Sequence, residues 1–277
     1  MWAPLDLKRD FPSVVRTLPP FPQIVLQLLD LLRDEDSSIE RLAKIAQKDA
    51  VISGNILACA NRVRRVHGQS DLDDPFAAAS LIGLNRVRAI VVTTGMNRFL
   101  AAGGADEFMF RHSLAVAIAA QELAMLCGVS PETAYVLGIL HDVGQLCFCQ
   151  ADAKAFEEVY AQASLDGRLL EREEAAFGID HCLMGSMLAD HWNLPQEFCY
   201  AIQTHHDDTI VIDKLQATIC LAETLARALD IPPSTKNRVT RINAPALDAL
   251  GLSWDSLDAK DCFGRCRARY RLAVSGG

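Results

Sequence analysis

Aromatic residues are scarce in this 277-residue chain, at 6%, although half of its residues are apolar. A large core is therefore available, and aliphatic side chains must build most of it. The sequence starts without the basic region and following apolar region that a secretory signal peptide needs. No uncharged apolar run approaches the roughly 20 residues of a membrane-spanning helix. We expect a cytoplasmic protein with no segment inside a membrane.

Excess positive charge is also missing, because the formal net charge is -8. This balance argues against general binding to nucleic acids or anionic membranes, which needs a basic surface. The nine cysteines are odd in number, and the sequence has no Cys-x-x-Cys pair. The sequence therefore predicts reduced, mostly buried thiols rather than disulfides or a zinc–thiolate site.

Regular strand alternation and internal repeats are absent as well. Apolar residues instead recur at helical spacing, as Ile24 and Leu28 do. Ser37–Glu40 forms a capping box, and Asp49 supplies a further N-terminal cap. The run 87–94 is rich in β-branched residues, but its place between helices favours a buried helix. We predict an all-α, multi-helix bundle with an additional N-terminal helical subdomain.

Three segments are predicted along the chain. Residues 1–104 form the N-terminal helical subdomain, which ends at a Gly-Gly pair. Residues 105–230 form the helical core, and residues 231–277 form a C-terminal helical extension. Within that extension, one helix from Ser253 to Val274 is predicted to be solvated or partner-facing. Its arginines, at alternate positions, are Arg265, Arg267, Arg269 and Arg271.

A short helix pair over residues 38–62 allows a second interpretation. Arg62, Arg64 and Arg65 follow it directly, which is the arrangement of a DNA-binding helix-turn-helix. The alternative is a packed helical pair with a solvated basic rim. We favour this alternative because the chain as a whole is acidic.

The most informative stretch runs from Leu137 to Gly144, where an apolar segment ends in His141 and Asp142. Ionisable groups are costly to bury unless they are paired or bind a metal. Imidazole and carboxylate groups together suit first-row transition metals. This pair therefore indicates one edge of a metal site.

Further histidines of the second half could complete such a site. Adjacent residues on a helix diverge by roughly 100°, so the pairs His141-Asp142 and His205-His206 cannot each aim both side chains at one spot. They can, however, straddle two ions bridged by one carboxylate, as in two-metal phosphoester hydrolysis. His67 and His191 are better explained as ordinary polar residues.

These residues, taken in order, resemble the HD superfamily of metal-dependent phosphohydrolases. The similarity includes Arg111-His112-Ser113, the Leu-x-x-Leu-His-Asp-x-Gly run, and His181-x-x-x-Gly185 leading to 192–195. The N-terminal half resembles the HDOD domain, the HD-related output domain of bacterial signalling proteins, at 18–22, 47–61 and 79–84. The resemblance covers roughly residues 15–230, with motifs distributed throughout.

The resemblance implies an HD-type helical bundle that binds one or two divalent transition-metal ions, such as Fe, Mn, Zn or Ni. Asp142 is the implied catalytic residue if the protein is active. Glu223 stands where relatives have an aspartate, and it can still act as a ligand. The implied metal ligands are His112, His141, Asp142, His181, His205, His206 and Glu223.

Two departures from the pattern of HD-GYP proteins, a group within the HD superfamily, bear on activity. Gln145 replaces a phosphate-contacting lysine, and no Gly-Tyr-Pro segment follows His205-His206. Hydrolysis of cyclic-di-GMP is therefore not expected. The resemblance instead implies a signal-transduction output module, of response-regulator type, with receiver, kinase or cyclic-dinucleotide-turnover domains as partners. The alternative is a metal-dependent phosphohydrolase acting on a nucleotide or another phosphoester.

Overall fold

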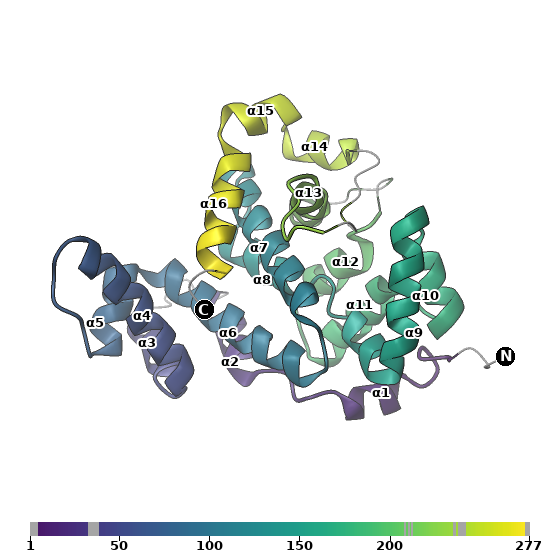
Figure 1. The fold of residues 1–277 in the computed structure, drawn as a ribbon, viewed down its shortest axis with the longest axis horizontal. Coiled ribbons are helices and arrows are strands. Elements are labelled where there is room, and N and C mark those ends of the chain that lie inside the picture. Colours follow the sequence, from purple (N-terminus) through teal and green to yellow (C-terminus); the bar gives the residue numbers. More distant parts are fainter. Residues whose placement is uncertain are drawn as a thin grey trace. The chain divides into compact units, whose positions relative to one another are not determined.

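A computed structural model describes residues 5–32, 39–207, 209, 211, 213–234, 237 and 242–274. Within these residues the secondary structure consists of helices and no strand, which confirms the all-α prediction (Figure 1). Two compact units make up the chain, one of residues 21–99 and one of residues 1–20 with 100–277. The division into segments 1–104, 105–230 and 231–277 remains a prediction.

The 21–99 unit begins with four helices that end before Gly83. Asp49 caps one of them as predicted, because its carboxylate accepts hydrogen bonds from the backbone N–H groups of Val51 and Ile52 at 2.9 and 3.1 Å. Of the predicted capping box, Ser37 and Ser38 lie outside the described residues. The helices are α2 (Gln23–Leu32), α3 (Ile39–Ala46), α4 (Ala50–Val66) and α5 (Pro75–Ile82).

Helix α6 (Leu84–Ala102) follows and carries the chain from this unit into the other. It contains the run 87–94, so the prediction of a buried helix there is confirmed, with Val87, Val91 and Val92 fully buried. The β-branched residues did not make a strand because their apolar side chains recur at helical spacing.

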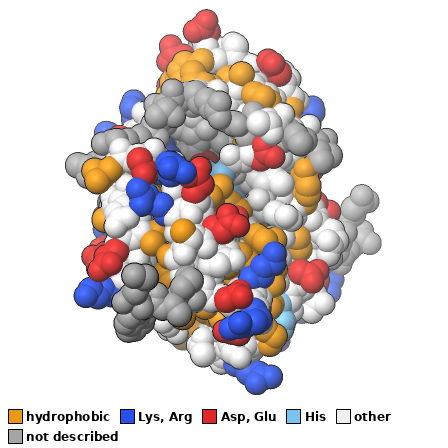
Figure 2. Space-filling model, turned by 90° about the vertical axis from the view of Figure 1, so that its right-hand side faces the viewer, with side chains coloured by type: hydrophobic (Ala, Val, Ile, Leu, Met, Phe, Trp, Pro, Cys, Tyr) orange, Lys and Arg blue, Asp and Glu red, His pale blue; other side chains and the backbone are white. Residues whose placement is uncertain are grey.

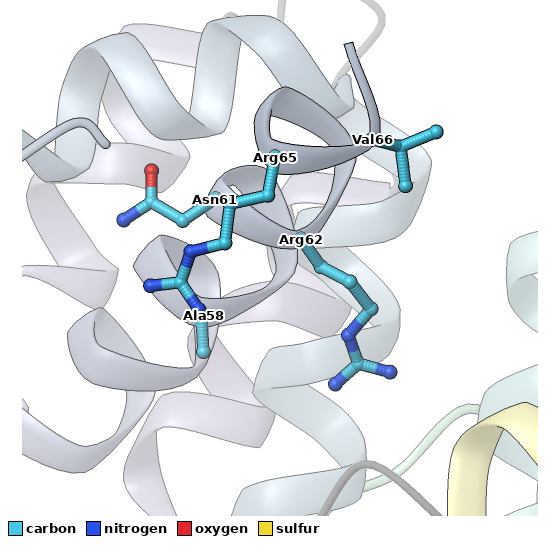
Figure 3. A pocket seen from close by; sticks show the side chains of 5 residues that line it. All are labelled: Ala58, Asn61, Arg62, Arg65 and Val66. Carbon is cyan, nitrogen blue, oxygen red and sulfur yellow. The ribbon is translucent and has the colours of Figure 1, made fainter. Parts of the chain in front are cut away.

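The arginines at the C-terminal end of α4 contact the loop that follows it. Arg65 Nε donates to Asp71 Oδ1 at 2.9 Å, and Arg64 Nε donates to the Ser70 carbonyl at 2.5 Å. Asn61 exchanges two hydrogen bonds with the backbone of Leu72, at 2.9 and 2.7 Å. Figure 3 shows Asn61 and Arg65 together on one wall of a surface pocket. Two of the three arginines therefore hold local structure.

The second unit is organised around α7 (Glu107–Cys127), which is buried along most of its length and contacts α8, α13 and α16 (Figure 1). Gly138 on α8 allows close packing, because a Cβ there would lie 2.5 Å from Ala117 Cα. The other helices are α1 (Phe11–Thr17), α8 (Pro131–Leu140), α9 (Gln145–Asp166), α10 (Leu169–Phe177), α11 (His181–His191), α12 (Gln196–Thr204), α13 (Lys214–Ala228), α14 (Ala244–Leu250), α15 (Trp254–Ala259) and α16 (Cys262–Val274).

The C-terminal extension differs from the prediction. The single helix expected from Ser253 to Val274 is two helices, α15 and α16, because the chain turns at Asp261 with a positive φ of 53°. Arg265 and Arg269 bind the buried Glu122 of α7 at 2.6 Å each. A buried carboxylate needs such partners, so α16 is docked on α7 instead of being a solvated helix.

The nine cysteines are all free thiols, as predicted. On the face drawn in Figure 2, positive and negative side chains are interspersed, and its described residues form no extended basic patch. Among the described residues, no single helix has the length and apolar composition needed to cross a membrane.

Candidate metal centre

The His-Asp pair lies where α8 ends. Helix α8 stops at Leu140, His141 is its C-cap, and Asp142 lies in the turn before α9. His141 keeps right-handed helical dihedrals (φ -55°, ψ -38°), yet its Nε2 lies 3.4 Å from Asp142 Oδ2. The two neighbouring side chains therefore serve one site.

Two glycines bring this turn against α11. A Cβ on Gly144 would lie 2.1 Å from the His181 carbonyl oxygen and 2.6 Å from Gly185 N. Real Cβ atoms do not approach backbone so closely, so glycine at 144 is required by space. The glycine of the His-Asp-x-Gly run thus allows Asp142 to reach His181.

Asp142 is the centre of the site because its two oxygens face different histidines. Oδ1 lies 3.2 Å from His181 Nε2 and 3.3 Å from His205 Nε2. Oδ2 lies 3.4 Å from His141 Nε2 and 3.7 Å from His112 Nε2. A carboxylate placed in this way is suited to bridge two adjacent ions.

Glu223 of α13 lies on the Oδ2 side of Asp142, beside His112 and His141. Its Oε2 lies 2.9 Å from His112 Nε2 and 3.6 Å from His141 Nε2. Its other oxygen accepts a hydrogen bond from Arg227. The pKa of Glu223 stays well below its usual value because Arg227 and His112 outweigh the effect of burial. The structure thus places a charged carboxylate where the sequence predicted a ligand.

Three histidines are oriented by hydrogen bonds at Nδ1, which leaves Nε2 for the site. His141 Nδ1 bonds the Gly138 carbonyl at 2.8 Å, and His205 Nδ1 bonds the Ile202 carbonyl at 2.7 Å. His181 Nδ1 bonds Glu173 at 2.6 Å. Metal-binding histidines are typically fixed by such partners, which set the tautomer and the ring orientation.

Two more side chains lie on the Oδ1 side of Asp142. His206 is half-buried, and its ring centroid lies 4.2 Å from that of His205 and 5.1 Å from that of His181. Helix α12 ends at Thr204, and both rings lie beside His181 although His205 keeps right-handed helical dihedrals. Cys182 Sγ lies 3.6 Å from His181 Nε2. Cys182 was not predicted as a site residue.

The structure therefore brings all seven predicted ligands together. It also adds Glu173, Cys182 and Arg227, which the sequence analysis missed. Glu173 lies within the charged run 171–174, which looks like a solvated helix face. Cys182 follows a predicted ligand directly, and this adjacency was the available signal. His67 lies in the other unit, and His191 contacts Phe11.

Unsatisfied buried atoms show that the site fits a cation. Four of the predicted ligands each have a buried atom that makes no well-aligned hydrogen bond: His112 Nε2, His141 Nε2, Asp142 Oδ1 and Glu223 Oε2. Buried polar atoms are normally bonded, and imidazole nitrogens and carboxylate oxygens are ligands for divalent metals. The donor sets are His181, Cys182, His205 and His206; His112, His141 and Glu223; and His141, Asp142 and His205.

Without a cation, charge is balanced by protons. Burial alone would lower the pKa of His141, but Asp142 outweighs it and raises that pKa to about 9. Burial likewise opposes charge on His205, but Cys182 and Asp142 raise its pKa to about 10. The pKa of Asp142 is held well below its usual value, against burial, by His141. A metal ion would replace these protons.

A pocket of about 270 Å³ leads to this site from one side. His112, Asp142 and Gln145 lie at the site end, and Phe108, Phe156 and Tyr160 form aromatic walls. Asp106 and Glu157 add negative charge. A small molecule could therefore reach the ligands from the surface.

The family follows from comparison with known sequences. The HDOD domain profile matches residues 18–208. This chain belongs to the HDOD domain family. The match includes both the helices of the 21–99 unit and the ligands up to His206.

Solved structures show the same fold. An HDOD domain protein of unknown function from Geobacter sulfurreducens is 26% identical, with a TM-score of 0.80, covering 97% of this chain and 96% of that one. A proposed signal transduction protein from Marinobacter aquaeolei VT8 is 18% identical, with a TM-score of 0.75 and coverages of 94% and 59%. A proposed metal-dependent phosphohydrolase from Shewanella amazonensis SB2B is 19% identical, with a TM-score of 0.60 and coverages of 95% and 97%.

An uncharacterized protein from Treponema pallidum is 22% identical over 222 residues. The match covers 77% of this chain and 43% of that protein. This chain thus spans less than half the length of that curated relative.

Proposed function

We propose that this chain is a signalling output module that acts by binding a partner protein and that holds one or two divalent transition-metal ions at an HD-type site. Its proposed partners are receiver, kinase or cyclic-dinucleotide-turnover domains. Membership of the HDOD family supports the class, and the buried donor cluster supports the metal.

The charge of the pocket is the observation that supports a non-enzymatic role. Among the described residues that line it, none is Lys or Arg, whereas three are acidic, namely Asp106, Asp142 and Glu157. Phosphoryl transfer depends on positive groups that stabilise charge on the transferring phosphate. Gln145 offers a neutral amide in the position of the lysine, and Arg227 is already bound to Glu223. Efficient hydrolysis is therefore not expected.

The ligands have separable roles once an ion is bound. Asp142 would bridge, His181 and His205 would hold one side, and His112 with Glu223 would hold the other. A bound divalent ion can supply Lewis acidity and lower the pKa of water. In an output module, the same ligands instead tie α7, α8, α11, α12 and α13 together, so occupancy stabilises one arrangement of the core.

Exposed apolar side chains in the 21–99 unit support a role in protein binding. Among the residues that the structure describes, nine large hydrophobic side chains are exposed, and five of them lie on α4 and α5. Val63 and Val66, three residues apart, share a face of α4, and Figure 3 shows Val66 beside Arg62 at its C-terminal end. Grouped exposed apolar residues are typical of interaction sites. We propose this α4–α5 surface as the partner-binding face.

The second candidate is a metal-dependent phosphohydrolase. Its specific support is Asp142, which faces two donor sets and also lines the pocket. Asp142 and the histidines would hold the ion, which would supply Lewis acidity toward a phosphoryl oxygen.

One experiment separates the two candidates. Metal-loaded protein is assayed with phosphomonoesters, phosphodiesters, nucleotides and cyclic dinucleotides, with Asp142→Ala as the background. In parallel, binding to receiver, kinase and cyclic-dinucleotide-turnover domains is titrated, with Val66→Glu as the interface variant. The output-module proposal expects no turnover above background and saturable binding that Val66→Glu weakens. Turnover that disappears in Asp142→Ala establishes the phosphohydrolase instead.

A further inference from the structure

Cys182 places a thiol inside the metal centre, on the Oδ1 side of Asp142. Cys182 is 4% exposed, and its Sγ lies 3.6 Å from His181 Nε2. The ligand atoms of His181, Cys182, His205 and His206 all lie within 4.8 Å of one another. The thiol therefore faces the same small volume as three imidazoles.

A separate observation marks this volume as a ligand position. Asp142 Oδ1 is buried, has no hydrogen-bond partner, and faces His181 Nε2 and His205 Nε2 at 3.2 and 3.3 Å. A buried carboxylate oxygen that makes no hydrogen bond is suited to bind a cation that the neighbouring imidazoles also bind. Sulfur, nitrogen and oxygen donors thus surround one place.

The other side of Asp142 has different chemistry. Its donors are His112, His141 and Glu223, with no sulfur. Thiolate favours softer or borderline ions such as Zn²⁺, whereas carboxylate suits harder ions such as Mn²⁺. The two positions are therefore chemically unequal.

We propose that Cys182 is a metal ligand, which binds as the thiolate and makes the histidine-rich position selective for a borderline ion such as Zn²⁺ or Co²⁺. On binding, the S–H proton leaves to solvent and the sulfur lone pair forms the metal bond. The inference rests on the metal-binding part of the proposed function. It goes beyond that proposal because it assigns a further ligand and a metal preference.

Cobalt reports sulfur ligation directly. The metal-free full chain is titrated with Co²⁺, and the near-ultraviolet thiolate-to-cobalt charge-transfer band is recorded together with the visible cobalt d–d bands. Cys182→Ser and Cys182→Ala are compared with Cys220→Ser. Cys220 is a matched control, since it is equally buried but its Sγ contacts the carbonyl oxygens of Thr204 and Asp207.

We expect the charge-transfer band in the wild-type protein and in Cys220→Ser, and its loss in both Cys182 variants. The variants should keep the d–d bands from the remaining nitrogen and oxygen ligands and should bind Zn²⁺ at least tenfold more weakly. Cobalt d–d bands without a charge-transfer band in the wild type overturn Cys182 ligation while leaving the metal site intact. Absence of every cobalt band overturns both Cys182 ligation and the proposed metal site. Circular dichroism confirms that the compared variants are folded.

Discussion

Glu173 accepts two hydrogen bonds from His181 through a single carboxylate oxygen. Its Oε2 lies 2.9 Å from the His181 backbone nitrogen and 2.6 Å from ring Nδ1. Both side chains are fully buried. This carboxylate therefore fixes the start of α11 and the orientation of one ligand ring at the same time.

Replacement of Glu173 by Ala should weaken metal binding by roughly 10- to 100-fold, the usual cost of losing a partner that orients a ligand. Glu173→Gln should lose less, because its amide oxygen can still accept. Isothermal titration with Zn²⁺ measures the change. The control is Glu174→Ala, one residue along the same helix and exposed. Equal affinities in Glu173→Ala and wild type would show that His181 needs no such partner.

Metal affinity should rise with pH. In the metal-free protein the pKa values of His141 and His205 are raised to about 9 and about 10, so both rings carry a proton at pH 7. Ligation needs neutral imidazole. For each proton that is displaced, the apparent Kd should therefore fall about tenfold with every unit by which the pH rises. Titration calorimetry at pH 6, 7 and 8, in buffers of different ionisation enthalpy, counts the released protons.

The same shifts carry a stability prediction for the metal-free protein. A raised folded-state pKa stabilises the fold fully below the unfolded value of 6.5. That contribution is lost as pH rises through about 9 to 10. The melting temperature of the metal-free protein should therefore fall as pH rises through this window. The melting temperature of the Zn²⁺-bound protein should change less. A metal affinity independent of pH would contradict the assigned protonation.

The sequence was sufficient for the fold class, because helical periodicity and caps are local signals, and the family resemblance indicated which residues gather at the candidate site. It did not predict how His205 and His206 converge. That depends on the packing of α12 against α11 and α13, which brings both rings beside His181.

Other features were missed because they depend on tertiary contacts. Glu173 sits among charged neighbours, and only the packing of α10 shows that it is buried. The arginines of α16 alternate in sequence, yet Arg265 and Arg269, four residues apart, both reach Glu122. The position of α16 on α7 depends on this buried carboxylate. Nothing within residues 253–274 indicates that position.

A cation at position 145 should restore phosphate affinity to the pocket. Gln145→Lys places an ammonium group beside His112 and Asp142, and a charge-assisted hydrogen bond should strengthen binding of inorganic phosphate about tenfold. Titration of the metal-loaded protein with phosphate measures this. Gln203→Lys adds the same charge at an exposed position and should have little effect. Equal gains in both variants would show that net charge, not pocket charge, limits binding.

Gly144→Ala should separate the His-Asp turn from α11. Its added Cβ would meet the His181 carbonyl at 2.1 Å and Gly185 N at 2.6 Å, and both are backbone atoms with little freedom to move. We expect a loss of about 1–3 kcal/mol of folding free energy and a lower metal content per folded chain.

Gly54→Ala is the matched control, because the position is helical and open, with no atom within 4 Å of the new Cβ. It should stabilise the protein by about 0.5–1 kcal/mol, since alanine favours helix over glycine. Urea unfolding and metal analysis of both variants provide the comparison. If Gly144→Ala keeps full metal content and stability, the close approach of the turn to α11 does not position Asp142, and its reach to His181 must come from another contact.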